Sequence, residues 1–190
     1  LSRMADTSDI RNGLMIRFKN DIFTVVEFLH VKPGKGGAFV RTKLKSMSTG
    51  QVLEHTFKSG EKLDQVRVER RAYQYLYNEG NLYHFMNSET FEQIPVEARQ
   101  IENKEFLQEN AECELLFDAD NEAILSVDLP NFVEVEVTYT EPGMKGDTVS
   151  NTTKPAKIDS GGEIKVPLFI DIGDKVKVDT RTGEYVERIK

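Results

Sequence analysis

The residues most able to do chemistry in this sequence form one short loop with a single long side chain between its glycines. In order, they are Lys32, Pro33, Gly34, Lys35, Gly36 and Gly37. Pro33 stiffens the entry to the loop, and the glycines let the backbone turn tightly without side-chain bulk. The Lys35 side chain places its charge roughly 6 Å from the backbone. It could therefore enter a narrow site or be modified by an enzyme, although an ordinary surface turn has the same composition.

The loop matches neither of the glycine-rich motifs that bind nucleotides. The pattern G-x-x-x-x-G-K-[ST] is absent, and the residues after the loop predict a strand where that motif needs a helix. Phe39 occupies the position of the last glycine in the dinucleotide pattern G-x-G-x-x-G. We therefore expect no nucleotide cofactor at this loop.

No other group of residues has the spacing of a catalytic or metal site. His30, His55 and His84 are far apart in the sequence and are expected to be ordinary strand residues. Cys113 is the only cysteine, so an internal disulfide is excluded, and its apolar surroundings predict a small buried side chain. No local pairing of a nucleophile with a base is visible. The sequence thus predicts neither catalytic residues nor a metal or other cofactor.

A basic stripe of three residues follows the loop. Arg41, Lys43 and Lys45 recur with a period of two, which places them on one face of a strand. Together with the two loop lysines they are the basic residues of the window 28–53, which contains no acid. If all of them contacted phosphates, the log–log slope of affinity against salt would be about −3.5 to −4.5. An ordinary solvated strand face is the alternative.

Charge is distributed unevenly along the 190 residues, whose net charge is −7. Residues 1–67 hold 12 basic and 7 acidic residues, residues 68–131 hold 4 and 14, and residues 132–190 hold 9 and 11. Such asymmetry indicates a partner that binds in one orientation. The basic third is therefore expected to face negative charge such as phosphate, and the acidic third to face away from it or toward a basic partner.

Short alternating segments separated by turns predict strands through most of the chain. The first third has the four or five strands of a small SH3-like barrel. In the middle third, Tyr73, Tyr75 and Tyr77 alternate along one strand. They could stack on bases, but packing in a core is the commoner role of aromatic residues on strands.

One helix is predicted, over residues 94–108. Its apolar residues have a spacing that places them on one inward face. They are Ala98, Ile101, Phe106 and Leu107.

These patterns together predict a mainly β protein of three consecutive small domains, at residues 4–67, 68–131 and 132–190. Residues 1–3 precede Met4 and are left out of this prediction. No apolar stretch approaches the ~18 residues that a membrane helix needs, and the N-terminus has no apolar signal segment. We therefore expect a cytoplasmic protein without a membrane partner.

Several motifs, spread over the length of the chain, resemble those of one family. Over residues 4–190 the chain closely resembles bacterial translation elongation factor P. The motifs that carry the resemblance are residues 32–36, 85–87, 89–93, 142–148, 154–156, 165–169 and 177–186. Lys35 together with a Gly-Asp-Thr sequence at 146–148 favours this family over its elongation-factor-P-like paralogues. Gly37 stands where many members carry a larger residue, which leaves the type of modification open.

The resemblance implies the fold of the three domains. The first would be a KOW/SH3-like barrel, and the second and third would be barrels of the OB-fold type, arranged as an L of about the size of a tRNA. Three domains of this length in a row would span roughly 80 Å.

The resemblance also implies a function and its site residues. The protein would be a monomeric, non-enzymatic factor that binds the ribosome between the peptidyl-tRNA and exit sites and relieves stalling at consecutive prolines. Lys35, extended by a lysine-modifying enzyme, would reach the CCA end of the peptidyl-tRNA, while the basic stripe faces tRNA and rRNA. The C-terminal domain would contact the exit-site codon and the small subunit. The residues near the exit-site codon would be Gly146, Asp147 and Thr148. The residues near the small subunit would be Tyr185 and Arg188.

Two other functions are compatible with the residues themselves. A generic RNA-binding barrel protein would need the basic stripe but not Lys35 in particular. The charge-preserving substitution Lys35→Arg would then have only a mild effect on its function. A scaffold that uses its acidic middle domain would retain a basic protein partner after RNase treatment. Chemistry at Lys35 distinguishes the first of these from the elongation factor.

Overall fold

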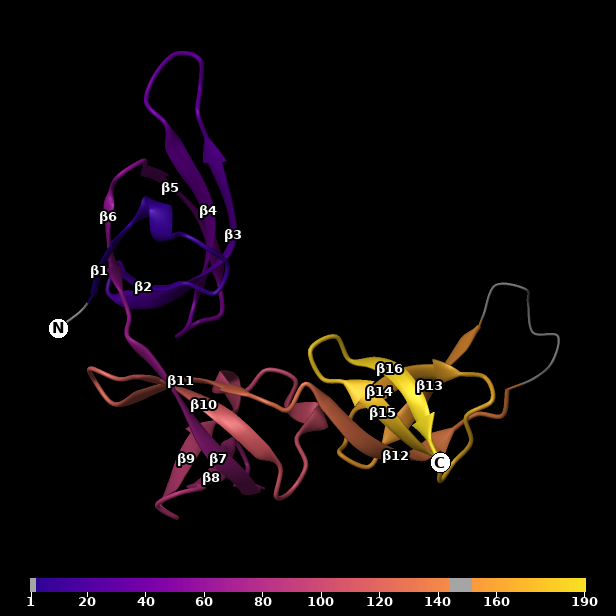
Figure 1. Ribbon diagram of the computed structural model, residues 1–190. Helices are drawn as coiled ribbons and strands as arrows, with labels where there is room; N and C mark the ends of the chain where they lie inside the picture. The colour runs from indigo at the N-terminus through magenta and orange to yellow at the C-terminus, as the bar shows by residue number, and fades with distance from the viewer. Residues whose placement is uncertain (1–2, 144–151) are drawn as a thin grey trace. The chain divides into compact units, whose positions relative to one another are not determined.

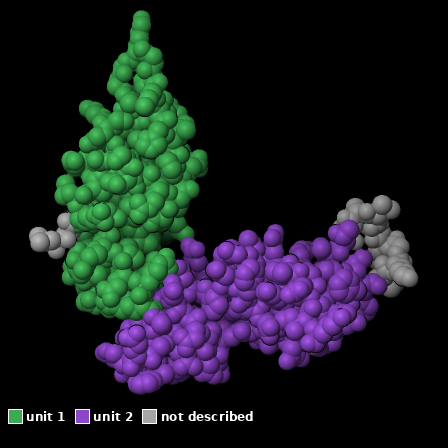
Figure 2. Space-filling model, viewed as in Figure 1, with its two compact units in different colours: residues 1–71, 116–126 green, residues 72–115, 127–190 purple. Residues whose placement is uncertain are grey.

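The computed structural model describes residues 3–143 and 152–190, and these residues form three β-sheets joined by turns (Figure 1). The mainly β class predicted from the alternation of apolar and polar residues is therefore confirmed. The chain divides into two compact units, which are described separately (Figure 2). Unit 1 contains residues 1–71 and 116–126, and unit 2 contains residues 72–115 and 127–190.

The first sheet has six strands in the order β1-β6-β2-β3-β4-β5. Arg3, which the sequence prediction left out, is the first residue of β1 and lies opposite Gln65 of β6. A short 3-10 turn, η1, covers Thr7–Asp9. The strands are β1 (Arg3–Asp6), β2 (Met15–Phe18), β3 (Asp21–Val31), β4 (Phe39–Ser46), β5 (Val52–Lys58) and β6 (Lys62–Gln65).

The first core lies on one face of this sheet, because apolar residues alternate with polar ones along each strand. Along β4, Val40 and Leu44 are both 0% exposed. Phe18, His55 and Phe57 stack near one another at its edge, with centroid distances of 4.5–5.9 Å. The buried residues are Ala5, Ile10, Leu14, Ile16, Phe23, Val25, Val40, Leu44, Phe57 and Leu63.

The second sheet has five strands in the order β11-β10-β7-β8-β9. The strands are β7 (Val68–Glu79), β8 (Leu82–Asn87), β9 (Gln93–Glu97), β10 (Glu112–Asp118) and β11 (Ala123–Asp128). The prediction of core packing is confirmed for Tyr73 and Tyr75, which are each 5% exposed. A bulge between Tyr75 and Tyr77 shifts the register, so Tyr77 pairs with His84, is 44% exposed and stacks on the His84 ring.

The predicted helix over residues 94–108 is wrong. Strand β9 covers the first part, and two 3-10 turns follow: η2 (Ala98–Gln100) and η3 (Lys104–Phe106). Pro95 lacks an N–H group, and Asn103 has a φ of 57°, so neither residue continues an α-helix. Of the four residues predicted to face inward, Ile101, Phe106 and Leu107 are buried, whereas Ala98 is only half-buried. Phe106 joins the core of the third sheet.

The third sheet has five strands in the order β14-β13-β12-β15-β16. The strands are β12 (Phe132–Thr140), β13 (Thr153–Ile158), β14 (Glu163–Pro167), β15 (Lys175–Asp179) and β16 (Glu184–Ile189). Phe106 from η3 lies against Gly183, where an added Cβ would meet its ring at 3.6 Å. The middle and last parts of unit 2 thus share one apolar cluster. The L-shaped arrangement and the domain boundaries at 67/68 and 131/132 remain predictions.

Cys113 provides a test of the core of the middle sheet. It is 3% exposed, and burial, helped by Glu112 and Asp128, raises the pKa of its thiol to about 12. Since only the thiolate is reactive, we expect Cys113 of the folded protein to resist a thiol reagent at pH 8 and to react fully in denaturant. The absorbance change with an aromatic disulfide reagent measures this. Rapid stoichiometric reaction of the native protein would contradict the described burial.

Candidate functional site

The candidate site lies at the end of a two-stranded ribbon in unit 1. Strands β3 and β4 remain paired up to Val31, which lies opposite Phe39, and residues 32–38 connect them. In Figures 1 and 2 this connection forms a narrow projection from the first sheet. A long ribbon is a suitable support for a tip, because cross-strand hydrogen bonds stiffen it up to the last pair.

Lys35 is exposed at this tip, as predicted. Among the described residues, no hydrogen bond or ion pair is found for its side chain. Gly36 has a φ of +98°, a conformation that side-chain-bearing residues rarely adopt, so a glycine is required after the lysine. An added Cβ at Gly34, Gly36 or Gly37 would have nothing within 4 Å. The space around Lys35 is therefore open to a partner or a modifying enzyme.

The rest of the loop is nearly as open. Lys32 is exposed and Pro33 is half-buried. At the base of the loop, the Arg41 guanidinium lies 5.7 Å from the centre of the Phe39 ring. On the opposite strand, the rings of Phe28 and His30 meet edge to face at 5.7 Å. These aromatic side chains support the ribbon where it leaves the sheet.

The basic stripe lies on one face of β4, as predicted, but it is partly neutralised. Lys43 lies between Glu27 of β3 and Glu54 of β5, and its Nζ is 2.9 Å from the Glu27 carboxylate. The hydrogen bond to Glu27 raises the pKa of Lys43, and the charges of Glu27 and Glu54 act in the same direction. The acid-free window 28–53 ends just short of both acids. A count along the sequence therefore overstated the free positive charge.

Arg41 and Lys45 differ from Lys43 in their cross-strand neighbours. Arg41 is exposed and faces Leu29 and Thr56. Leu29 is itself 58% exposed. Lys45 is half-buried between Thr24 and Val52. Neither cation has an acid directly opposite it in the register.

The predicted sites of the last third are only partly within the described residues. Gly146, Asp147 and Thr148 lie outside them. Tyr185 is half-buried and packs against the third core. Arg188 is exposed, and its guanidinium lies 5.4 Å from the centre of the Phe169 ring. Both residues belong to β16, so they share one element at the edge of the third sheet.

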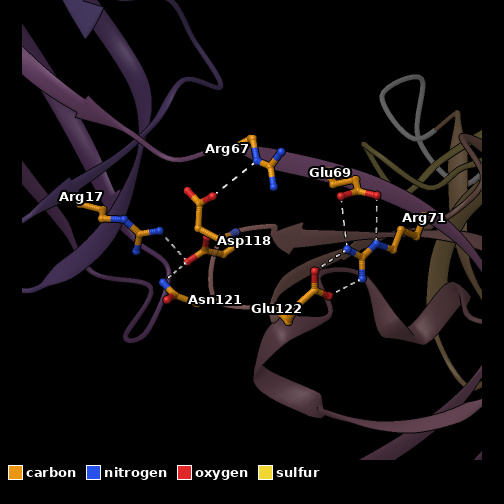
Figure 3. A network of polar contacts seen from close by, with 8 residues as sticks. Arg17, Arg67, Glu69, Arg71, Asp118, Asn121 and Glu122 are labelled. Carbon is orange, nitrogen blue, oxygen red and sulfur yellow. Dashed lines mark hydrogen bonds and ion pairs between the residues drawn. The ribbon is translucent and has the colours of Figure 1, made fainter. Parts of the chain in front are cut away.

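One group of polar residues was missed by sequence reasoning. Arg17 of β2 forms an ion pair with Asp118 of β10 at 2.7 Å (Figure 3). The only signal in the sequence is an aspartate at the end of the apolar run Leu115-Leu116-Phe117. Nothing local could assign it a partner 101 residues away.

Neither a metal-binding cluster nor a membrane-spanning helix is found among the described residues. Within residues 3–143 and 152–190, no group of three or more histidine, cysteine, aspartate or glutamate residues is arranged to hold a metal ion. In the same residues, no helix has the length and apolar character needed to cross a membrane.

Family models match nearly the whole chain in three consecutive segments. Residues 6–63 match the elongation factor P KOW-like domain. Residues 68–127 match the elongation factor P OB domain, and residues 133–188 match the C-terminal region of elongation factor P. The KOW-like first domain and the OB-type second domain of the predicted fold agree with these matches.

Curated relatives and a solved structure agree with the family models. The chain is 54% identical over 187 residues to elongation factor P of Flavobacterium psychrophilum, which covers 98% of this chain and 100% of that protein. It is 53% identical over 187 residues to elongation factor P of Amoebophilus asiaticus, covering 98% of each. A solved eukaryotic translation initiation factor 5A from Methanococcus jannaschii has a TM-score of 0.55 at 19% identity and covers 68% of this chain and 92% of that one. That likeness supports the fold.

Proposed function

The chain belongs to the elongation factor P family of translation elongation factors, and from that premise we propose that it binds the ribosome between the peptidyl-tRNA and exit sites and speeds peptide-bond formation at consecutive prolines. The observation that carries this proposal is the exposed Lys35 at the end of the β3–β4 ribbon, with open space around the glycines that flank it. A lysine in that position can enter a narrow site without moving the sheet behind it.

The proposed mechanism is positional. Proline is a constrained donor and acceptor of the peptidyl group, so its reaction suffers when the reacting ends are poorly oriented. Lys35 would hold the CCA end of the peptidyl-tRNA through its cation and N–H donors, and orientation of this kind can lower a barrier by several kcal/mol. The ribosome makes the bond, so the protein is not itself an enzyme and needs no dissociable cofactor.

Covalent extension of Lys35 by a lysine-modifying enzyme is part of the proposal. The exposure of Lys35 and the glycines beside it supports this, because a modifying enzyme must enclose the whole side chain. A longer side chain would also extend the reach of the tip. Neighbouring Lys32 is exposed too, so its substitution is a matched control for that of Lys35.

The remaining contacts follow from charge and from the family. Exposed Arg41 and the rest of the basic stripe would face tRNA and rRNA phosphates. Gly146, Asp147 and Thr148 would lie near the exit-site codon, and Tyr185 and Arg188 near the small subunit. The acidic middle third would face away from RNA or toward a basic ribosomal protein. We propose a cytoplasmic monomer with no membrane partner.

A reconstituted translation assay tests the proposal. A reporter containing three consecutive prolines is translated with this protein, prepared both alone and with its modifying enzymes, and full-length product is compared with that of a reporter without prolines. We expect faster synthesis of the proline reporter only. If neither preparation changes it, the elongation factor mechanism is contradicted, and a generic RNA-binding function becomes the better explanation.

The two neighbouring cations of the basic stripe should differ in their effect on ribosome binding. If Arg41 contacts phosphate, Arg41→Ala removes one released counterion and reduces the magnitude of the log–log salt slope by about 0.7–0.9. Lys43→Ala should change the slope less, because Lys43 is already paired with Glu27. Fluorescence anisotropy of labelled protein with ribosomes, between 50 and 200 mM salt, measures both slopes. If the salt slope of Arg41→Ala equals that of the unsubstituted protein, Arg41 does not contact phosphate.

A further inference from the structure

A polar network joins the first sheet to the hairpin of residues 116–126, both within unit 1 (Figure 3). Arg17 Nη2 donates a hydrogen bond of 2.7 Å to Asp118 Oδ2. The Asp118 side chain is 1% exposed and that of Arg17 is 28% exposed. Breaking such a pair is costly, because it leaves a charge buried without its partner.

Asp118 is held from its own side of the contact as well. Asn121 Nδ2 donates to Asp118 Oδ2 at 2.9 Å, and the backbone N–H of Asp120 donates to Oδ1 at 3.2 Å. Both oxygens are therefore occupied. The network continues with Arg67, whose Nε lies 3.5 Å from the Asp120 carboxylate.

A second arginine ties the start of β7 to the same hairpin. Arg71 donates to both carboxylate oxygens of Glu122, at 2.7 and 3.0 Å, and also to Glu69. Its guanidinium lies 4.3 Å from the centre of the Phe117 ring. Fork-like pairing of this kind restricts orientation more than a single contact does.

Apolar packing lies between these polar contacts. Val66, Leu116 and Leu125 form a buried cluster. Met15 and Ile22, from β2 and β3, pack against it, as does Met47. The apolar cluster holds the hairpin and the first sheet together but does not fix their relative orientation, because hydrophobic attraction is non-directional. The hydrogen-bonded Arg17–Asp118 ion pair does restrict that orientation.

The network lies at the base of the strand that leads to the tip, so a small rotation at the network would displace the tip by several ångströms. Arg17 lies opposite Ile22, at the start of β3, and β3 runs from there to Val31 beside the tip loop. Nine residue steps along a strand span about 30 Å. A rotation of 10° at the base would therefore move the tip by about 5 Å, close to the ~6 Å reach of the lysine side chain.

We propose that Arg17 and Asp118 are positioning residues that fix the direction of the Lys35 tip by holding the base of its sheet against the hairpin of residues 116–126. The expected loss of activity rests on the proposed function, whereas the expected change in the distance distribution does not. Neither residue contacts the reacting groups. Their effect is carried by the β3–β4 ribbon.

The direct test is a distance measured within unit 1. Spin labels are attached to cysteines introduced at Ser59, whose N–H bonds the Ala38 carbonyl beside the tip loop, and at Ala123 of the hairpin. Buried Cys113 stays in place. We expect one narrow distance distribution for the otherwise unchanged protein and at least a doubled width for Arg17→Met and Asp118→Asn. Arg17→Lys, which keeps the charge, should remain close to the narrow distribution.

Activity provides the second readout, with a matched control. The maximal rate of triproline synthesis should fall about 10- to 100-fold in Arg17→Met, since displacements of 1 Å can have effects of that size. The concentration giving half-maximal rescue should change less than about 3-fold, because the tip and the basic stripe are intact. Arg181→Met is the control, because it removes an Arg–Asp pair of 2.9 Å outside unit 1 and should leave the distance distribution narrow.

The outcomes separate the two proposals. Unchanged distance widths in folded Arg17→Met and Asp118→Asn would overturn the positioning role, as would broadened distances with an unchanged maximal rate. If Arg17→Met does not fold, as judged by circular dichroism, Asp118→Asn decides: its distance distribution should broaden and its maximal rate should fall. If the unsubstituted protein shows no rescue at all, the proposed function fails, while the distances still decide whether the pair holds the hairpin.

Discussion

Replacing Lys35 with alanine is expected to reduce triproline rescue at least 10-fold while leaving the fold unchanged. The side chain is exposed, and no hydrogen bond or ion pair is found for it within the described residues, so its loss removes no stabilising contact. What is lost is the group that orients the CCA end, and orientation effects reach several kcal/mol. The rate of full-length synthesis in the reconstituted assay measures this, and circular dichroism confirms the fold.

Two further substitutions make this result specific. Lys35→Arg keeps the charge but cannot be extended as lysine is, so we expect a loss nearly as large as that of Lys35→Ala. Lys32→Ala removes an exposed lysine from the same loop and should change the rate less than about 3-fold. A mild effect of Lys35→Arg would instead support the generic RNA-binding function, in which only charge matters.

Replacing Arg17 with alanine is expected to lower the free energy of unfolding of unit 1 by about 3 kcal/mol. The reason is that Asp118 stays buried without its cation. Lys43→Ala also removes an ion pair of the first sheet, but both partners are largely exposed to solvent, so it should lower the free energy of unfolding much less than Arg17→Ala does. Urea unfolding at pH 7 measures both variants. Equal small effects would mean that the Asp118 charge is hydrated in solution.

The dependence of this difference on pH is a check of its cause. Burial by itself would raise the pKa of Asp118, but hydrogen bonds from Arg17 and Asn121, with the charge of Arg17, hold the pKa below its usual value. A lowered pKa adds stability at pH values above the ordinary ~3.9, and this stability is lost as pH falls through the folded-state value. The stability gap between the unsubstituted protein and Asp118→Asn should therefore be present at pH 7 and close below about pH 4. The neighbouring acids Asp120, Glu69 and Glu122 are present in both proteins.

Local patterns in the sequence were sufficient for the strands and for the tip. Alternation along β4 placed Val40 and Leu44 on the buried face and the basic stripe on the other, because side chains of a strand alternate between faces. The glycines around Lys35 predicted an open turn, and the structure has one. The burial of Tyr73, Tyr75 and Cys113 also followed from alternation. These properties depend on neighbouring residues alone.

Tertiary packing decided the features that local patterns left open or predicted wrongly. Apolar spacing over residues 94–108 predicted a helix, yet Phe106 is buried in the third core, and the chain reaches it through two 3-10 turns. Tyr77 is exposed because a single bulge shifts the register of β7 against β8. In both cases the position of a distant or neighbouring strand outweighed the preference of the segment itself.

The charged residues show most clearly which features the sequence determined and which only the tertiary structure decided. The types and spacing of the residues determined that the first third is basic and that Lys35 stands alone at a tip. The sequence could not show that Glu27 and Glu54 flank Lys43, because the cross-strand register is set by turns and a bulge in β3. Nor could it show that Arg17 meets Asp118, 101 residues away. An ion pair between distant segments forms only after both have packed, and only then does burial make its charges count.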